Sequence, residues 1–367
     1  MSSIIKSHCL FKSLQRSWLP IMSQTCLSKR PKDKVSGLAA HPHMTISPRF
    51  YSSPPAAPSS VQQRKKLTIL NINRMYKHGE PISMMTAQDY PSGLMVDRSG
   101  IDICLVGDSL AMVALGYDST NPLTVDEMLH HCRAVARGSK SPFLIADLPS
   151  GSYEVSPEEA VRTSLRLVKE GNMEAVKLEG GKEMAGTIRR IASVGIPVMA
   201  HIGLTPQRQS ALGGFRVQGK TAKQAMNLVE DALAVQEAGA FAVLLEAMPA
   251  QIGDYITQRL SIPTIGIGAG PMCSGQVLVL NDAMGIFDRF VPKFTKQYAN
   301  LNQVMTSALE QYHQDVKTKQ FPSPENTYPI DQAQLDKFWN AVSNSNNHDA
   351  PLKRQQIDQE KIVSAHG

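Results

Sequence analysis

The feature that most constrains this chain is a repeated one, a short apolar run that stops at a carboxylate. The run 101–106 is followed by Gly107 and Asp108, and later runs end in Asp147, Glu179 and Glu246. Such runs are typical of strands buried on both faces of a parallel sheet. The acids are 39, 32 and 67 residues apart, which corresponds to one, one and two strand–helix units of roughly 30 residues each.

Helix signals fill the intervals between these runs. Thr124 stands three residues before Glu127, and Ser156 precedes Pro157 and Glu159, as in helix-starting capping boxes. We predict strands at 82–87, 101–106, 143–147, 175–179, 197–202, 242–246, 263–267 and 290–294. We predict helices at 68–77, 90–99, 125–136, 157–170, 183–192, 222–237, 252–260 and 301–317, whereas 277–286 is ambiguous. About eight alternating units over 67–330 favour a (β/α)₈ TIM barrel, with a doubly wound open sheet as the alternative.

The two ends of the chain differ in composition from this body. Residues 1–60 hold eight Lys and Arg but one acid, Asp33, and are rich in serine. This composition predicts a mitochondrial presequence over 1–51, with Arg49 before a cleavage site, a flexible lead-in over 52–66, and a matrix location. A disordered basic tail is the alternative. Residues 331–367 are polar and should be largely disordered, although the apolar patch 338–342 can dock as a short helix.

Composition also excludes several classes of function. The excess positive charge belongs to the N-terminus, so the body presents no basic surface for nucleic acid. No apolar run approaches the ~20 residues of a membrane-spanning helix. The five cysteines are scattered without CxxC spacing, which argues against a disulfide framework and a zinc cluster and favours a reducing compartment.

The four strand-end acids predict a shared site. In a (β/α)₈ barrel the carboxyl ends of all strands face one mouth, where catalysis takes place. A single acid there is often only a turn or helix cap, but four in phase would repel one another unless a cation neutralised them. Carboxylates with few histidines select a hard cation, so we expect Mg²⁺, held by three of the acids. The fourth would act as a base, and Glu246 is the best candidate because the apolar residues before it should raise its pKa.

Three further residues each have a functional and a purely structural interpretation. Lys177 points to the same face as Glu179, and it can clamp a substrate carboxylate or enolate oxygen, pair with an acid, or form a Schiff base. His201 can relay a proton or donate to substrate, or it can be a hydrogen-bonded core histidine. Ser109 can donate to substrate or cap a helix.

Several blocks of the sequence, taken together and in order, resemble the ketopantoate hydroxymethyltransferase family. They run from about Thr68 to Tyr328 and include LVGDSL (105–110), ADLP (146–149), VKLEGG (176–181), HIGLTPQ (201–207), GGFRVQG (213–219) and IGIGAG (265–270). One departure is Pro271-Met272-Cys273-Ser274, where many members have an acid before the next Gly-Gln; the predicted site residues are unaffected.

The resemblance implies a fold, a reaction and a set of site residues. The fold is a barrel of the phosphoenolpyruvate/pyruvate-binding type. The reaction moves a one-carbon unit from 5,10-methylenetetrahydrofolate onto 3-methyl-2-oxobutanoate, giving 2-dehydropantoate in the first committed step toward pantothenate. It implies Mg²⁺ on Asp108, Asp147 and Glu179, with Glu246 as proton acceptor. It also implies keto-acid contacts from Asp108, Ser109, Asp147 and Lys177, and ring-based homo-oligomers, commonly decamers.

Two rival functions follow from the same residues. One is another Mg²⁺-dependent 2-oxo-acid lyase or mutase of this barrel superfamily, which would cleave a C–C bond without folate. The other is a catalytically inactive barrel kept as an assembly module. An inactive module is expected to have lost some of the strand-end acids. Here the site positions are all filled, by Asp108, Asp147, Lys177, Glu179 and Glu246.

Overall fold

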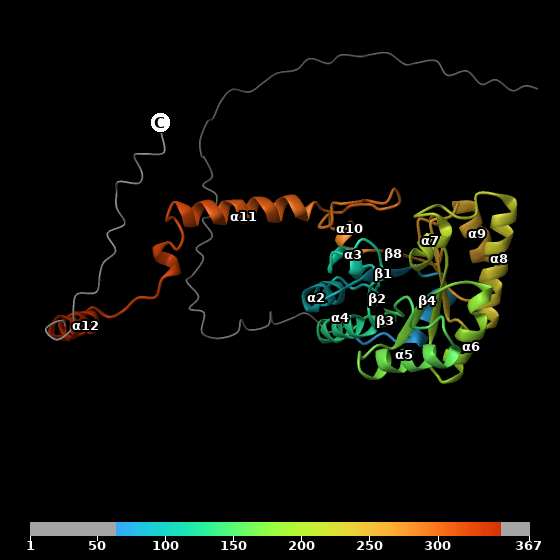
Figure 1. The fold of residues 1–367 in the computed structure, drawn as a ribbon, viewed down its shortest axis with the longest axis horizontal. Coiled ribbons are helices and arrows are strands. Elements are labelled where there is room, and N and C mark those ends of the chain that lie inside the picture. The colour runs from blue at the N-terminus through green and yellow to red at the C-terminus, as the bar shows by residue number, and fades with distance from the viewer. Residues whose placement is uncertain (1–63, 346–367) are drawn as a thin grey trace, which may run out of the picture. The chain divides into compact units, whose positions relative to one another are not determined.

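Eight parallel strands close into a barrel in the computed structural model, which describes residues 64–345 (Figure 1). Each strand pairs with its neighbours in sequence, and the last pairs with the first. The predicted (β/α)₈ fold is therefore confirmed, and the open sheet is excluded. The predicted presequence, most of the predicted lead-in and residues 346–367 lie outside the described residues. The strands are β1 (Ile82–Thr86), β2 (Ile103–Val106), β3 (Phe143–Asp147), β4 (Ala175–Glu179), β5 (Val198–Gly203), β6 (Ala242–Glu246), β7 (Thr264–Ile267) and β8 (Gly275–Leu278).

Helices connect the strands, and Figure 1 shows α4, α5, α6 and α8 outside the ring. Thr124 and Ser156 cap α4 and α5 as predicted, accepting hydrogen bonds from the backbone N–H groups of Glu127 and Glu159. The helices are α1 (Ile69–Lys77), α2 (Tyr90–Arg98), α3 (Leu110–Val113), α4 (Val125–Gly138), α5 (Pro157–Lys169), α6 (Ala185–Ser193), α7 (Gln209–Leu212), α8 (Ala222–Glu237), α9 (Ala250–Arg259), α10 (Leu280–Ala283), α11 (Leu301–Lys317) and α12 (Gln332–Ser345). Short 3₁₀ turns are η1 (Lys182–Met184), η2 (Pro206–Arg208) and η3 (Pro324–Asn326).

The strands are buried on both faces because they separate two apolar cores. Alternate residues point inward and outward, so Ile103 and Leu105 of β2 belong to the barrel interior while Cys104 and Val106 face the helices. The interior core also includes Ile72 of α1, whose helix packs against the barrel interior. The inward-facing residues are apolar in the amino-terminal part of the strands and polar at their carboxyl ends. The polar residues therefore gather at the end of the barrel where active sites of this fold lie.

One predicted strand is wrong. Residues 290–294 form no strand, and the eighth strand is β8, in the segment whose sequence was ambiguous. Pro292 has no N–H to give to a strand ladder, and Phe294 instead packs on Gly268, where a Cβ would lie 2.6 Å from its ring. β8 needs Gly275 because a side chain there would collide with the Ile82 carbonyl.

The segment after the barrel contains two helices. α11 begins where Leu301 and Asn302 donate backbone hydrogen bonds to the carbonyls of Met284 and Gly285. The apolar patch of the predicted tail, 338–342, lies within α12. Within the range 64–345, no helix combines the length and the apolar character needed to cross a membrane.

Candidate active site

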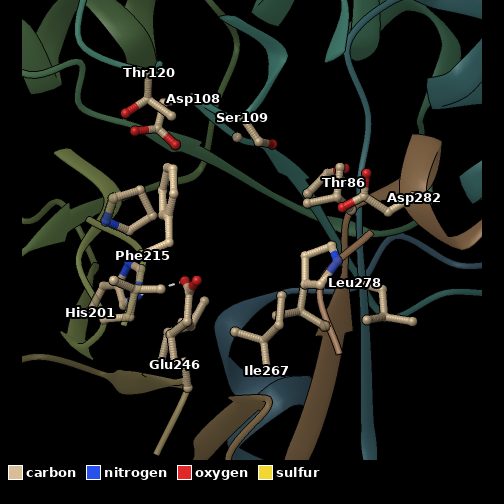
Figure 2. A pocket seen from close by; sticks show the side chains of 18 of the residues that line it. Thr86, Asp108, Ser109, Thr120, His201, Phe215, Glu246, Ile267, Leu278 and Asp282 are labelled. Atoms are coloured by element: carbon tan, nitrogen blue, oxygen red, sulfur yellow. Dashed lines mark ion pairs between the residues drawn. The ribbon is translucent and has the colours of Figure 1, made fainter. Parts of the chain in front are cut away.

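The predicted site residues meet in one cavity at the carboxyl ends of the strands (Figure 2). The cavity has a volume of about 360 Å³. Two loops, which include Phe215 and Phe294, contribute to its walls. The predicted residues that line it are Asp108, Ser109, Asp147, Lys177, Glu179, His201 and Glu246.

Strand register explains why residues so far apart in sequence meet. Asp147 lies opposite Lys177, and Glu179 lies opposite His201. Glu246 lies opposite Gly203, two residues after His201. Paired positions in parallel strands share a face, and so do residues two apart on one strand. One inward-facing set therefore runs across β3, β4, β5 and β6, and the predicted common orientation of Lys177 and Glu179 is found.

Asp147 and Lys177 form a buried ion pair. Lys177 Nζ lies 3.0 Å from Asp147 Oδ1, and their side chains are 4% and 3% exposed. Burial raises the pKa of Asp147 to about 7 in spite of the neighbouring ammonium. Burial alone would lower the pKa of Lys177, but the carboxylates of Asp147, Asp108 and Glu179 outweigh it and the pKa is raised. Lys177 is therefore a fixed positive charge among acids.

Gln207 connects two of the predicted metal ligands, a role that the sequence did not predict. Its side-chain amide donates to Asp108 Oδ2 at 2.8 Å, and its backbone N–H donates to Glu179 Oε2 at 3.0 Å. The buried Tyr153 hydroxyl donates to the Gln207 side-chain oxygen at 2.6 Å. The Asp108 N–H donates to Asp147 Oδ2 at 2.9 Å. Neither aspartate acts as the turn or helix cap that was the alternative, and all three acids are tied into one network.

His201 lies between Lys177 and Glu246. Its Nδ1 is 3.3 Å from Lys177 Nζ, and its Nε2 is 3.1 Å from Glu246 Oε2. Among the described residues, Nε2 has no aligned hydrogen bond despite that short distance. Burial and the Lys177 charge hold the pKa of His201 well below its usual value, so the ring is neutral. His201 is buried like a core histidine, but its Nε2 lies beside the Glu246 carboxylate without an aligned hydrogen bond.

Glu246 is a carboxylate that lines the cavity, with its side chain 13% exposed. Burial raises its pKa to about 8, against the opposing effect of Lys177. Ala247, which follows it, has φ of +48°, a left-handed conformation that is uncommon outside glycine. Strain of this kind persists where the surrounding structure imposes it, often at functional sites. Glu246 therefore has the pKa and the access expected of a base near neutral pH.

The donor set suits a hard divalent cation. Asp147 Oδ1 makes no aligned hydrogen bond beside its ion pair with Lys177, and Glu179 Oε1 makes none beside His201 Nδ1, which lies 3.5 Å away, in the described structure. Residues 64–345 contain no group of three or more His, Cys, Asp and Glu side chains already arranged around one ion. Mg²⁺ commonly takes only one or two carboxylates, and waters or substrate oxygens complete its shell. The chemistry of Asp108, Asp147 and Glu179 therefore fits Mg²⁺, with waters or substrate oxygens completing its shell.

Ser109 occupies the N-cap position of α3, yet its side chain makes no capping hydrogen bond. It lines the cavity instead. Its Oγ would lie 3.2 Å from a Cβ at position 107, so Gly107 keeps this turn open. Ser109 therefore does not cap this helix through its side chain, which lies at the cavity wall.

The sequence reasoning also missed Asp282, a buried acid of α10 that lines the same cavity. Its signal was weak because it lies in the ambiguous segment 277–286. The sequence signal for Gln207 was stronger, because this residue ends the HIGLTPQ block (201–207).

The sequence of the chain is similar to proteins of one known family. The family model for ketopantoate hydroxymethyltransferase matches residues 66–324. A 3-methyl-2-oxobutanoate hydroxymethyltransferase of Emericella nidulans is 54% identical over 296 residues, covering 80% of this chain and 85% of the relative. A protein of Oryza sativa subsp. japonica, named 3-methyl-2-oxobutanoate hydroxymethyltransferase 2, mitochondrial, is 52% identical over 284 residues, covering 76% of this chain and 71% of the relative.

Similar solved structures are far more distant in sequence. A phosphonopyruvate hydrolase in complex with oxalate and Mg²⁺ is 13% identical with a TM-score of 0.49, covering 77% of this chain and 99% of that one. A phosphoenolpyruvate phosphomutase of Streptomyces platensis subsp. rosaceus is 16% identical with a TM-score of 0.47, covering 76% and 99%.

Proposed function

This chain belongs to the ketopantoate hydroxymethyltransferase family, and from that membership we propose that it transfers a hydroxymethyl group from 5,10-methylenetetrahydrofolate to 3-methyl-2-oxobutanoate, giving 2-dehydropantoate. The observation that carries the proposal is the placement of Glu246, whose pKa is about 8, in one cavity with Asp108, Asp147 and Lys177. A base, a cation and metal-type acids in one site suit proton abstraction beside a carbonyl group.

The substrate's charged end is assigned to the Lys177 side of the cavity. The buried ammonium of Lys177 would hold the keto-acid carboxylate, and the Ser109 hydroxyl would donate to a second oxygen. His201 would donate from its open Nε2, either to substrate or to Glu246. These contacts would place the C3 hydrogen of the substrate toward Glu246.

Asp108, Asp147 and Glu179 would hold Mg²⁺, with Glu179 and the aspartates oriented by Gln207 and by the Asp108 N–H. When bound, the cation would polarise the keto group and make the neighbouring C–H more acidic. It would also neutralise acids that otherwise repel one another at the mouth.

Glu246 would then take the C3 proton. Its raised pKa makes the carboxylate a stronger base than an exposed glutamate, while it remains largely ionised only near and above pH 8. The C3 carbon would use the electron pair of the broken C–H bond to form a bond to the methylene carbon of the donor, as one of the two C–N bonds of that carbon breaks. Water would supply the new hydroxyl as the other C–N bond breaks, and tetrahydrofolate would leave with the C3 proton and one water proton on its N5 and N10.

We place the protein in the mitochondrial matrix, as its plant relatives are named mitochondrial and residues 1–51 have presequence composition. We also propose a homo-oligomer, in keeping with the ring assemblies implied by the family. In the single chain, Val304, Met305, Leu309 and Tyr312 of α11 are each more than half exposed, which a subunit contact would relieve.

The direct test is an assay of the full-length protein for Mg²⁺-dependent formation of 2-dehydropantoate from 3-methyl-2-oxobutanoate and methylenetetrahydrofolate. We expect 2-dehydropantoate to form only when Mg²⁺, 3-methyl-2-oxobutanoate and methylenetetrahydrofolate are all present. Cleavage of a C–C bond without folate would identify a lyase of the same barrel type instead. Absence of any turnover, together with normal folding, would favour an inactive assembly module.

A further inference from the structure

Asp282 lies in the cavity wall away from the acids described above. It belongs to α10, directly after β8, and β8 stands four strands from β4 in either direction around the closed barrel. Figure 2 shows Asp282 and Thr86 on one side of the pocket and His201 and Glu246 on the other. The Asp282 side chain is therefore across the mouth from the β4 residues Lys177 and Glu179, and two strands away from the proposed base on β6.

The Asp282 carboxylate has no partner among the described residues. The residue is only 9% exposed, yet the hydrogen bonds and ion pairs within 64–345 include none to its side chain. Burial alone raises its pKa to about 6. Asp108, Asp147 and Glu179 have Lys177 or Gln207 beside them, and Glu246 has His201, whereas Asp282 has none of these. Its oxygens are not fully enclosed, so the carboxylate is open to the cavity and available to accept hydrogen bonds from a ligand.

The backbone that carries Asp282 is nevertheless held firmly. The Leu280 N–H donates to Thr86 Oγ1, and Asn281 accepts from Gln88 Nε2 and donates to the Val113 carbonyl, each at 3.0 Å. Asp282 is not the cap of α10, because the N-cap is Val279 and no side-chain capping bond is present. The carboxylate is thus oriented by its neighbours and has no structural task of its own.

The surroundings of Asp282 differ from those of the acid cluster. Leu278, Val279 and Phe294 give this part of the cavity apolar walls. The exposed cations Arg216 and Lys293 also line the cavity. A short keto acid bound at the Lys177 side would leave this apolar part free. The remaining space suits a flat, largely apolar ring with hydrogen-bond donors on one edge and an anionic tail.

We propose that Asp282 recognises the pterin ring of the one-carbon donor, its two carboxylate oxygens accepting hydrogen bonds from the ring N3–H and the 2-amino group. This inference rests on the proposed function, because that function supplies tetrahydrofolate as the carrier. The two donors lie side by side on the pterin edge, which is the arrangement a carboxylate accepts in a bidentate manner. Arg216 and Lys293 would face the carboxylates of the glutamate tail. The C3 carbon and the one-carbon unit would then approach each other between Glu246 and Asp282.

The test uses the full-length protein and tetrahydrofolate, measured by calorimetry in oxygen-free buffer. Asp282→Asn keeps the size of the side chain but replaces one acceptor oxygen by a donor. Loss of a hydrogen-bonded charged partner should weaken tetrahydrofolate binding about 10- to 100-fold, and the KM for the methylene donor should rise more than that for the keto acid. Asp254→Asn, on the outer helix α9, is the matched control and should leave both values unchanged.

A ligand change makes the assignment specific. A tetrahydrofolate analogue with a methyl group in place of the 2-amino group should bind wild type at least about tenfold more weakly than tetrahydrofolate, and this ratio should fall to nearly one in Asp282→Asn. The proposal would be overturned if Asp282→Asn bound tetrahydrofolate within about twofold of the wild-type affinity. It would also be overturned if the ratio of the affinities for tetrahydrofolate and the analogue were the same in the variant as in wild type. A large fall in the unfolding temperature of the variant would overturn it as well, because it would show a structural role.

Failure of this inference can be told from failure of the proposed function. If wild type forms no 2-dehydropantoate but binds tetrahydrofolate through Asp282, the pterin site stands and the assigned reaction falls. If the product forms and Asp282→Asn binds tetrahydrofolate normally, the reaction stands and the pterin site lies elsewhere. If wild type binds no tetrahydrofolate, the inference is wrong.

Discussion

His201 Nε2 lies 3.1 Å from Glu246 Oε2 at the junction of β5 and β6, with both side chains buried or nearly so. The imidazole is neutral because burial and Lys177 hold its pKa well below its usual value. A neutral ring whose Nδ1 faces the Lys177 ammonium carries its proton on Nε2, so it can donate toward Glu246. His201 is therefore the polar neighbour that can steady the ionised form of the base.

Replacing His201 should make Glu246 harder to ionise. In His201→Phe the carboxylate would lose a donor worth about 1.5–3 kcal/mol to its charged form, or roughly one to two pH units. The acid limb of the pH–rate profile for exchange of the substrate C3 hydrogen should move to higher pH by that amount. His201→Gln, which keeps a donor, should restore part of the shift. An unmoved acid limb with a lowered unfolding temperature would reduce His201 to a packing role.

Replacing Asp147 should weaken metal binding. Asp147→Asn removes the charge while its remaining oxygen can still accept from the Asp108 N–H. We expect the Mg²⁺ concentration for half-maximal activity to rise about tenfold or more, since a charged ligand is lost. Calorimetric titration with Mg²⁺ measures this directly, and Asp126→Asn, an exposed acid of α4, is the control. Wild-type metal affinity in Asp147→Asn would reject the assignment.

Gln207 should affect Mg²⁺ affinity indirectly, by orienting the ligand Asp108. Gln207→Leu would free Asp108 and remove one of the hydrogen bonds that orient it. Residues that orient metal ligands commonly change affinity by about 10- to 100-fold. We therefore expect a fall of that size in Mg²⁺ affinity, while Gln258→Leu on the exposed face of α9 should have none. If circular dichroism shows a folded variant with unchanged Mg²⁺ affinity, the network has no part in binding.

The stability of the metal-free enzyme should fall as the pH rises. The folded-state pKa values of Asp147 and Glu246, about 7 and about 8, lie above their ordinary values of 3.8 and 4.5. Raised acids contribute stability that is complete below their ordinary pKa and is lost as the pH rises through 7 and 8. His201, with a lowered pKa, acts in the opposite sense only below about pH 6.5.

The unfolding temperature in a chelator should therefore be lower at pH 8.5 than at pH 6.5. Mg²⁺ should raise it more at the higher pH, because the cation binds ionised carboxylates. Scanning calorimetry with and without Mg²⁺ at both values measures the difference. A double variant, Asp147→Asn with Glu246→Gln, should show a flatter pH dependence. Equal stabilisation by Mg²⁺ at both pH values would contradict the assignment.

The barrel and most of the site could be predicted because their signals are local. The strand β3 and the acid that ends it are adjacent in sequence, and parallel register then brings Asp147 to Lys177. The predicted bounds of β4, β6, α8 and α11 agree with the structure for the same reason, since each has a clear period and a clear stop.

The parts that could not be predicted depend on contacts between distant residues. Gln207 follows β5 in a short 3₁₀ turn, and only the closed barrel brings its amide to Asp108 of another strand. Asp282 lies in a four-residue helix, too short for periodicity to reveal. Phe294 looked like part of a strand, but its ring fills the space that Gly268 leaves. Sequence spacing contains none of this information.

The central claim is that Glu246 removes the C3 proton of 3-methyl-2-oxobutanoate. Its most direct test is proton NMR of that substrate with the full-length protein and Mg²⁺ in deuterated water, without folate. Wild type should exchange the C3 hydrogen, and Glu246→Gln should exchange it about 100- to 10,000-fold more slowly, with keto-acid binding retained. Exchange by Glu246→Gln within a few-fold of the wild-type rate would contradict the account.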